Sequence, residues 1–281
     1  MTKKTYKASP LPFQGQKRRF LKPFCDRIAD LPNDTIFVDL FGGSGLLSRG
    51  AKDVNESFRV IYNDYDHFTD RLVNIATTNQ LLTDIRLAIG DFPIEKILPK
   101  DMRASVLKII ESYIEKGLYV DYITLSGSLL FSMNYAVNYA DLSKKTLYNN
   151  VKRTDYNDAD NYLEGLEVVH YDYRELYEQY KDIPNVFFIV DPPYLSTEVS
   201  SYESYWNLSQ YLEVLPILKD VSFAYFTSAK STIVELLDYI TKHYDAENPF
   251  AAAEKIQICQ TLNYSSKYND IMLFKHLLKS I

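Results

Sequence analysis

Short apolar runs alternate along most of this chain with stretches whose apolar residues recur every three or four positions. The first pattern is typical of strands and the second of amphipathic helices. Their alternation predicts an α/β protein built on a largely parallel sheet. The expected strands cover 35–43, 58–64, 166–172, 186–191 and 221–228, and the expected helices cover 45–53, 66–90, 174–180, 208–219 and 230–242.

The last two strand-like segments, 255–264 and 269–276, alternate around a short polar turn. They predict a terminal hairpin that adds an antiparallel edge to the sheet, a mixed arrangement that is common.

Residues 95–165 depart from this alternation. Two helices are expected there, over 101–116 and 121–139, and a polar, tyrosine-rich segment follows them. The basic side chains of that segment are Lys144, Lys145, Lys152 and Arg153. The pattern predicts an inserted subdomain or long functional loop that divides the α/β domain into two parts, 1–94 and 166–281.

Composition narrows the class of protein. The 281 residues are 46% hydrophobic and 24% charged, which is ordinary for a soluble globular protein. The net charge of -6 argues mildly against indiscriminate binding to polyanions, although the basic residues at the amino end form either a solvated terminus or a set of phosphate contacts. Cys25 and Cys259 show neither metal-ligand spacing nor a disulfide framework. With no signal peptide or spanning segment in the pattern, we expect a cytoplasmic protein.

A glycine turn, DLFGGSG at 39–45, follows the first expected strand. Glycines allow a sharp turn and close approach of a ligand, and open α/β sheets bind ligands at the carboxyl ends of their strands. The turn lacks the dinucleotide G-x-G-x-x-G pattern and the lysine of a phosphate-binding loop. Asp64 or Asp66, at the end of the next strand, can accept hydrogen bonds from ribose hydroxyls or cap the following helix.

The apolar run FFIV at 187–190 ends on Asp191, Pro192, Pro193 and Tyr194. Because proline cannot continue a strand ladder, the chain must leave the sheet at Asp191. The sequence therefore predicts a carboxylate held at the sheet edge on a stiff corner, next to an aromatic ring.

Together with PLPFQGQKRR at 10–19, the motifs VDLFGGSG and VDPPY resemble the S-adenosylmethionine-dependent DNA adenine methyltransferases of the Dam type, the D12 class. The motifs follow the order of that family over roughly 10–275, and the resemblance is weak through 95–165. It implies a Rossmann-like methyltransferase fold with a mostly parallel seven-stranded sheet, an antiparallel C-terminal hairpin and a mainly helical target-recognition insert.

The resemblance also implies roles for the matching residues. Asp191 matches the catalytic acid, flanked by Pro192 and Pro193, and Tyr194 matches the aromatic residue that stacks on the target base. Asp64 is preferred over Asp66 as the ribose acid because it is closer to the strand end. The implied S-adenosylmethionine contacts are Phe13, Gly15, Lys17, Asp39, Phe41, Gly42, Gly43, Gly45, Asp64, Asp172 and Tyr173.

The chemistry fits these residue types. The lone pair of an adenine exocyclic amine is delocalised into the ring, so hydrogen bonds from the amine to Asp191 and a proline carbonyl would direct it outward. Orientation and electrostatics would then supply most of the catalysis, without a metal. The amine is unreachable inside a duplex, so the base must be flipped out and held by stacking, as Tyr194 could do.

The implied partner is double-stranded DNA, bound by a monomer. Phosphate contacts are expected from the amino-terminal basic residues and from Lys144, Lys145, Lys152 and Arg153. The segment after Tyr194 is hypothesised to close over the flipped base, with Tyr205 or Trp206 near the DNA, although an ordinary helix start with buried rings explains it equally well.

Two alternatives stay open at this level. Amine methylation of cytosine or of RNA is one, because the Asp-Pro-Pro-Tyr chemistry does not choose the ring. A DNA-binding relative without catalysis is the other, and the intact motif argues against it. The sequence does not indicate which DNA site is recognised.

Overall fold

The computed structural model describes residues 5–131, 134–194, 206, 208–244, 246–263 and 266–277, with backbone alone for 260–263 and 266–268. Within these residues a single sheet of seven strands has the order β3-β2-β1-β4-β5-β7-β6. The strands are β1 (Ile36–Asp39), β2 (Arg59–Asn63), β3 (Glu167–Val169), β4 (Val186–Val190), β5 (Ser222–Ser228), β6 (Glu254–Asn263) and β7 (Ser266–Lys275). The predicted α/β fold and its terminal antiparallel hairpin are therefore confirmed.

The neighbours β1 and β4 mark the point where the chain changes direction across the sheet. β1 pairs in parallel with β2 on one side and with β4 on the other, where Asp39 lies opposite Ile189. A ligand crevice forms at such a switch point, outside the carboxyl ends of the strands. Asp39 ends β1 and Asp191 follows β4, so both carboxylates come to this edge.

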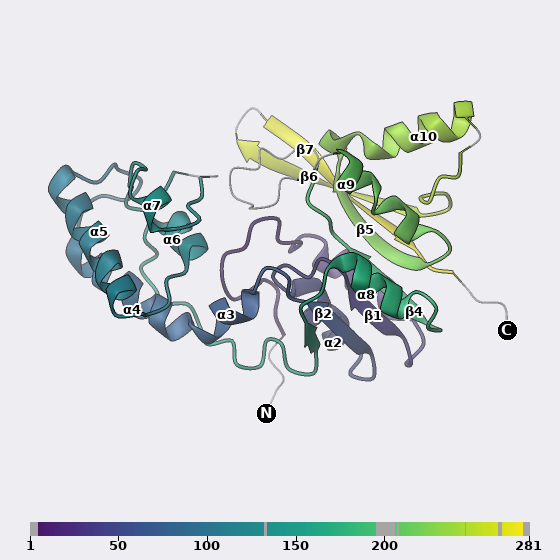
Figure 1. Ribbon diagram of the computed structural model, residues 1–281, viewed down its shortest axis with the longest axis horizontal. Coiled ribbons are helices and arrows are strands. Elements are labelled where there is room, and N and C mark those ends of the chain that lie inside the picture. Colours follow the sequence, from purple (N-terminus) through teal and green to yellow (C-terminus); the bar gives the residue numbers. More distant parts are fainter. Residues whose placement is uncertain are drawn as a thin grey trace.

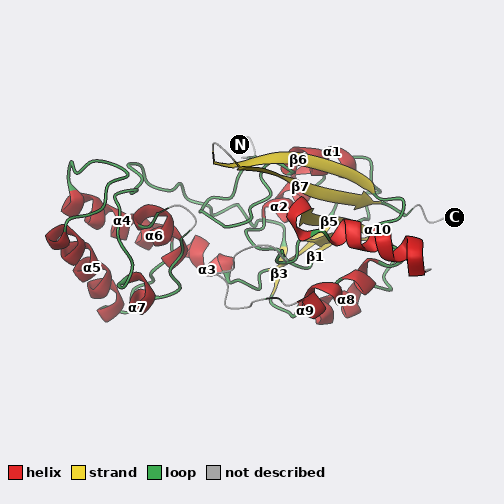
Figure 2. Ribbon diagram, turned by 90° about the horizontal axis from the view of Figure 1, so that it is seen from above, coloured by secondary structure: helices red, strands yellow, loops and turns green. Residues whose placement is uncertain are grey.

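Helices cover both faces of the sheet. They are α1 (Leu21–Ile28), α2 (Leu46–Val54), α8 (Tyr173–Tyr180), α9 (Leu208–Leu212) and α10 (Ile233–Tyr244), with 3-10 turns η1 (Leu215–Leu218) and η2 (Ala229–Ser231). Phe188 and Val190 of β4 join a buried cluster with α8, α9 and α10, whereas Phe187 and Ile189 join one with α1 and α2 (Figure 2). Each such burial contributes about 1.5–3 kcal/mol, which explains why the buried strands are apolar throughout.

A separate helical part stands beside the sheet (Figure 1). Its elements are α3 (Phe68–Val73), α4 (Ile75–Ile89), α5 (Lys100–Glu115), α6 (Tyr122–Leu129) and α7 (Tyr139–Leu142). Its own buried cluster contains Leu81 and Ile85 of α4, Val106 of α5 and Leu125 of α6. Because α4 contributes to that cluster, residues before 95 also belong to the packing of the helical part. The predicted boundaries of the insert, at 95 and 165, stay a prediction.

Several predicted helices have different bounds. The helix expected over 66–90 is divided at Asn74, and the one over 208–219 gives way to a 3-10 turn at Pro216. The helix expected over 121–139 is wrong beyond Leu129, because the Ser126 hydroxyl accepts the Ala136 amide at 2.8 Å. The apolar residues after Leu129 still pack into the buried cluster of the helical part, but on a chain that turns back instead of continuing the helix.

Two more differences concern the ends of predicted elements. Helix α1 was not predicted, although Phe24 and Ile28 are buried on its inner face. The strand expected over 166–172 is paired only at Glu167–Val169.

Candidate active site

A cavity of about 1460 Å³ opens at the carboxyl ends of β1 and β4. The segments 39–44 and 191–194 supply its floor from these two strands, and the amino-terminal segment 12–20 supplies one side. Residues 172–174, ahead of and within α8, complete the wall. Motifs that are far apart in the sequence thus meet at one sheet edge, as the parallel topology predicts.

The glycine turn is shaped by the close approach of neighbouring side chains. A Cβ at Gly42 would lie 2.4 Å from the Tyr62 ring, and one at Gly43 would lie 3.0 Å from Phe13. Gly43 and Gly45 have φ values of 49° and 68°, which side chains rarely adopt. Glycine is therefore required here by packing as well as by backbone conformation, and Phe13 packs directly on the turn.

Asp39 is a buried acid under this turn. Its Oδ2 accepts the Ser48 hydroxyl at 2.6 Å, and its Oδ1 makes no hydrogen bond among the described residues. Burial raises the pKa of Asp39 to about 7, and the Ser48 hydrogen bond opposes that rise. The carboxylate can therefore accept a further donor from the cavity side.

The preferred ribose acid, Asp64, is not in the cavity wall. It is fully buried, and its carboxylate accepts the amides of Phe68 at 2.6 Å and Thr69 at 2.8 Å. These bonds cap the first turn of α3, so Asp64 performs the capping role that was the alternative for an acid here. Asp66 lines the cavity instead, next to the exposed ring of Tyr65.

Three aromatic rings form one wall of the cavity. The Phe41 and Tyr173 ring centroids lie 4.9 Å apart, and Trp206 lies 5.6 Å from Phe41 and 5.5 Å from Tyr173. This wall suits a flat apolar ring. Trp206 was expected near DNA and here packs with two predicted cofactor residues, whereas Tyr205 lies outside the described residues.

Asp172 lines the cavity beside this wall, but its carboxylate is engaged locally. It caps α8 by accepting the Arg174 amide at 2.9 Å and also pairs with the Arg174 guanidinium at 2.9 Å. Hydrogen bonding to that side chain lowers the pKa of Asp172.

The Asp-Pro-Pro-Tyr corner carries the most constrained charge in the cavity. Asp191 Oδ2 lies 2.5 Å from the Lys17 ammonium, and Lys17 also donates to the Gly15 carbonyl at 2.7 Å. Asp191 Oδ1 is buried without a hydrogen bond among the described residues. Burial raises the pKa of Asp191, while the Lys17 charge opposes the rise. The sequence predicted Lys17 as a cofactor contact and did not predict this ion pair.

The helical part reaches the cavity through α6 and the segment after it. Ile123, Gly127, Asn134 and Tyr135 line the cavity, and sequence reasoning missed all four. Spacing of four residues between Ile123 and Gly127 puts both on one helix face. That spacing is a weak signal of a binding site, because helices buried in a protein core show the same spacing as often.

The four predicted basic DNA contacts lie outside the cavity wall. Lys144, Lys152 and Arg153 are exposed, and Lys145 pairs with Asp141 at 3.3 Å. The Lys152 ammonium also lies 4.5 Å from the Tyr156 ring centroid. Their position is compatible with a surface contact and not with a contact to a ligand in the cavity.

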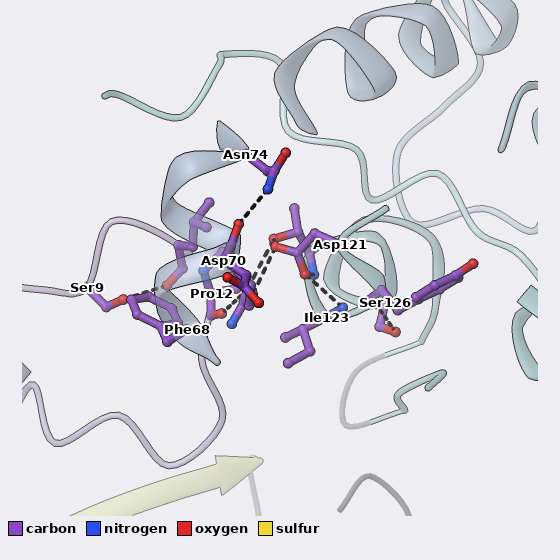
Figure 3. A network of polar contacts seen from close by, with 12 residues as sticks. Ser9, Pro12, Phe68, Asp70, Asn74, Asp121, Ile123 and Ser126 are labelled. Atoms are coloured by element: carbon purple, nitrogen blue, oxygen red, sulfur yellow. Dashed lines mark hydrogen bonds and ion pairs between the residues drawn. The ribbon is translucent and has the colours of Figure 1, made fainter. Parts of the chain in front are cut away.

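A buried ion pair within the helical part, between Arg71 and Asp121, also contacts the amino-terminal segment at Pro12, and Figure 3 shows Asp121 and Pro12 close together. Arg71 of α3 donates to Asp121 Oδ2 at 3.0 Å and to the Pro12 carbonyl at 2.7 Å. Asp121 also caps α6 by accepting the amides of Ile123 and Thr124. One guanidinium thus holds the start of α6 and the chain just before Phe13.

No helix within the described residues is long and apolar enough to cross a membrane. The same part of the chain contains no group of three or more His, Cys, Asp or Glu side chains arranged to hold a metal ion.

Comparison with known proteins gives two matches. Residues 13–279 match the family described as "D12 class N6 adenine-specific DNA methyltransferase". A Haemophilus influenzae protein described as "Putative methyltransferase" is 34% identical over 281 residues, which cover 97% of this chain and 94% of that protein. The match spans all three motifs and the helical insert.

Proposed function

Because the chain belongs to the D12 class N6 adenine-specific DNA methyltransferase family, we propose that it transfers a methyl group from S-adenosylmethionine to N6 of a flipped-out adenine in duplex DNA. The observation that carries this proposal is Asp191, whose buried Oδ1, at the switch point between β1 and β4, accepts no hydrogen bond from the part of the chain that the structure describes. A buried acceptor of this kind needs a donor, and an exocyclic amine supplies one.

The cavity residues fit S-adenosylmethionine. The wall of Phe41, Tyr173 and Trp206 would hold its adenine ring, and the Gly42–Gly43 turn would admit the rest of the molecule close to the backbone. Asp66, rather than Asp64, is the proposed ribose acid because it lines the cavity. When bound, the cofactor supplies an electrophilic methyl group on a sulfonium sulfur.

Asp191 would orient the target amine. Its Oδ1 accepts one amine hydrogen and the Pro192 carbonyl accepts the other, which favours a tetrahedral nitrogen whose lone pair points away from both acceptors. Such fixed acceptors cost no reorganisation during the reaction and typically contribute about 10²–10³ in rate.

Tyr194 would hold the flipped base in place. Its ring lies 5.1 Å from the Lys17 ammonium, next to Asp191, so a base stacked on this ring would bring its amine near the acid. Stacking of a base on an aromatic ring contributes about 1–3 kcal/mol in nucleic-acid proteins.

The DNA would span the cavity mouth and the helical part. Ile123, Gly127, Asn134 and Tyr135 support this placement because they reach the cavity from α6 and its continuation. Lys144, Lys145, Lys152 and Arg153 are the proposed phosphate contacts. They would fix the position of the protein along the duplex but would not select the DNA sequence.

One assay tests the proposed function. The protein is incubated with methyl-labelled S-adenosylmethionine and duplex DNA, the DNA is digested, and the modified nucleoside is identified. We expect N6-methyladenine. Methylcytosine, label in RNA alone, or absence of labelled nucleoside with retained DNA binding would contradict the proposal and favour one of the alternatives.

A further inference from the structure

Lys17 is almost entirely removed from solvent, with 8% of its side chain exposed. Its ammonium is held between Asp191 Oδ2 at 2.5 Å and the Gly15 carbonyl at 2.7 Å. Gly15 has a φ of 76°, a conformation that turns its carbonyl back toward this lysine without side-chain strain. The amino-terminal motif therefore directs a cation at the catalytic acid.

The other groups that face Asp191 do not stabilise its charge in this way. Asp270, on β7, raises the pKa of Asp191, and the charge of Asp191 in turn raises the pKa of Asp39. Tyr194 lowers the pKa of Asp191 less than Lys17 does. The buried phenols of Tyr211 and Tyr225 also face this charge.

The charge of Asp191 decides which way its hydrogen bond with an amine runs. An ionised carboxylate only accepts, so it leaves the nitrogen lone pair for the methyl group. A protonated carboxyl can donate, and donation would engage the same lone pair. Because burial favours the protonated form, an adjacent cation is needed to keep the acid productive.

We propose that Lys17 is a positioning residue for methyl transfer, which holds Asp191 ionised through Oδ2 and leaves Oδ1 for the target amine. This inference rests on the proposed function of the site and extends it. It also separates Lys17 from the cofactor contacts, because its ammonium is committed to Asp191 and Gly15.

The test compares Lys17→Met and Lys17→Arg with the control Lys219→Met, whose lysine is exposed and pairs with Glu247. The carboxyl of Asp191 is titrated by carbon-13 NMR in the DNA-free protein, and its signal is assigned with Asp191→Asn. Single-turnover methylation is measured against pH, and S-adenosylmethionine affinity is measured by calorimetry.

In Lys17→Met we expect the pKa of Asp191 to rise, because the cation that opposes the effect of burial is gone. The acid limb of the pH–rate profile should move to higher pH as well, because Asp191 is ionised in fewer molecules at a given pH. The rate at neutral pH should fall about 10²-fold, while cofactor affinity stays close to that of the unaltered protein. Lys17→Arg should restore most of the rate, and Lys219→Met should behave like the unaltered protein.

An unchanged Asp191 titration in both Lys17 variants would overturn the inference. So would weakened cofactor affinity with an unchanged rate and pH profile at saturation, which would return Lys17 to the cofactor contacts. If Lys17→Met does not fold, Lys17→Gln takes its place, because it also removes the charge and should give the same rise in the pKa of Asp191 and the same shift of the profile. Failure of the unaltered protein to methylate would remove the proposed function, yet the NMR titration would still report on the ion pair.

Discussion

The carboxyl edge of the sheet and the helical part position their functional side chains by different means. At the sheet edge, hydrogen-bonded strands in fixed register bring Asp39 and Asp191 together. In the described residues of the helical part no strand is formed, and α6 is held by a local apolar cluster, by the Arg71–Asp121 pair and by backbone hydrogen bonds from Tyr148 and Asn150. Backbone register therefore fixes the positions of the two acids, whereas side-chain packing fixes the position of the surface that is proposed to meet DNA.

The two regions also use buried ion pairs for different ends. Lys17–Asp191 lies in the cavity, where one carboxylate oxygen has no hydrogen bond among the described residues. Asp121 has both oxygens occupied, by Arg71 and Thr124 on one and by two amides on the other. A buried carboxylate with both oxygens satisfied stabilises a joint, whereas one with an oxygen left over can bind a ligand.

The largest expected effect tests the sheet edge. Asp191→Asn should lower the methylation rate about 10³-fold, because the amide cannot provide a charged acceptor at the position of Oδ1. Affinity for S-adenosylmethionine should change little, since Asp191 is proposed to meet the amine and not the cofactor. Single-turnover kinetics and calorimetry measure the two quantities. Asp182→Asn, on the exposed loop before β4, is the control, and equal rates in both variants would remove the central role of Asp191.

Arg71→Met tests the joint between the regions. Removing one partner of a buried pair leaves Asp121 uncompensated and should cost about 3–5 kcal/mol in the free energy of unfolding. Urea denaturation measures this loss. The matched control is Arg59→Met, which breaks the exposed pair with Glu167 and should cost about 1 kcal/mol or less. If both variants lose the same free energy of unfolding, the buried Arg71–Asp121 pair stabilises the fold no more than an exposed ion pair does.

Trp206→Ala decides whether this ring belongs to the cofactor wall or to the DNA contacts. Loss of its packing with Phe41 and Tyr173 should weaken S-adenosylmethionine binding about tenfold, within the 1–3 kcal/mol typical of a stacked ring. Affinity for DNA, measured by fluorescence anisotropy, should be unchanged. A variant that loses DNA affinity and keeps cofactor affinity would support the original expectation for this loop.

The smallest expected effects concern the surface cations. Lys144→Ala with Lys145→Ala, and separately Lys152→Ala with Arg153→Ala, should weaken DNA binding equally on all sequences. Each lost phosphate contact should reduce the slope of log affinity against log salt by about 0.9. Lys219→Ala, which breaks an exposed pair with Glu247, is the control outside the helical part. A changed site preference with an unchanged salt slope would contradict a phosphate role.

Much of the sheet could be predicted because its local signals agree with its burial. The run FFIV followed by Asp191-Pro192 specifies a buried strand and its end without reference to any distant residue. The glycine turn after β1 is equally local. The site that these two motifs form was predictable as well, because parallel strands end at the same edge.

Other features depended on contacts between distant segments. Asp64 and Asp66 differ by two positions, and only the amides of Phe68 and Thr69 decide that Asp64 caps α3. The end of α6 depends on a hydrogen bond between Ser126 and Ala136 that no helical period reveals. Lys17 could equally have faced solvent or cofactor.

Local sequence was thus sufficient for the resemblance to the family, for the two strand ends that carry its motifs and for the terminal hairpin. Tertiary packing decided which acid faces the cavity, which oxygen of Asp191 is occupied and where α6 meets the site. The physical reason is one of range. Strand ends and turns are set by dihedral and hydrogen-bond constraints within a few residues, whereas the partner of a buried charge is chosen by whichever segment the whole fold brings beside it.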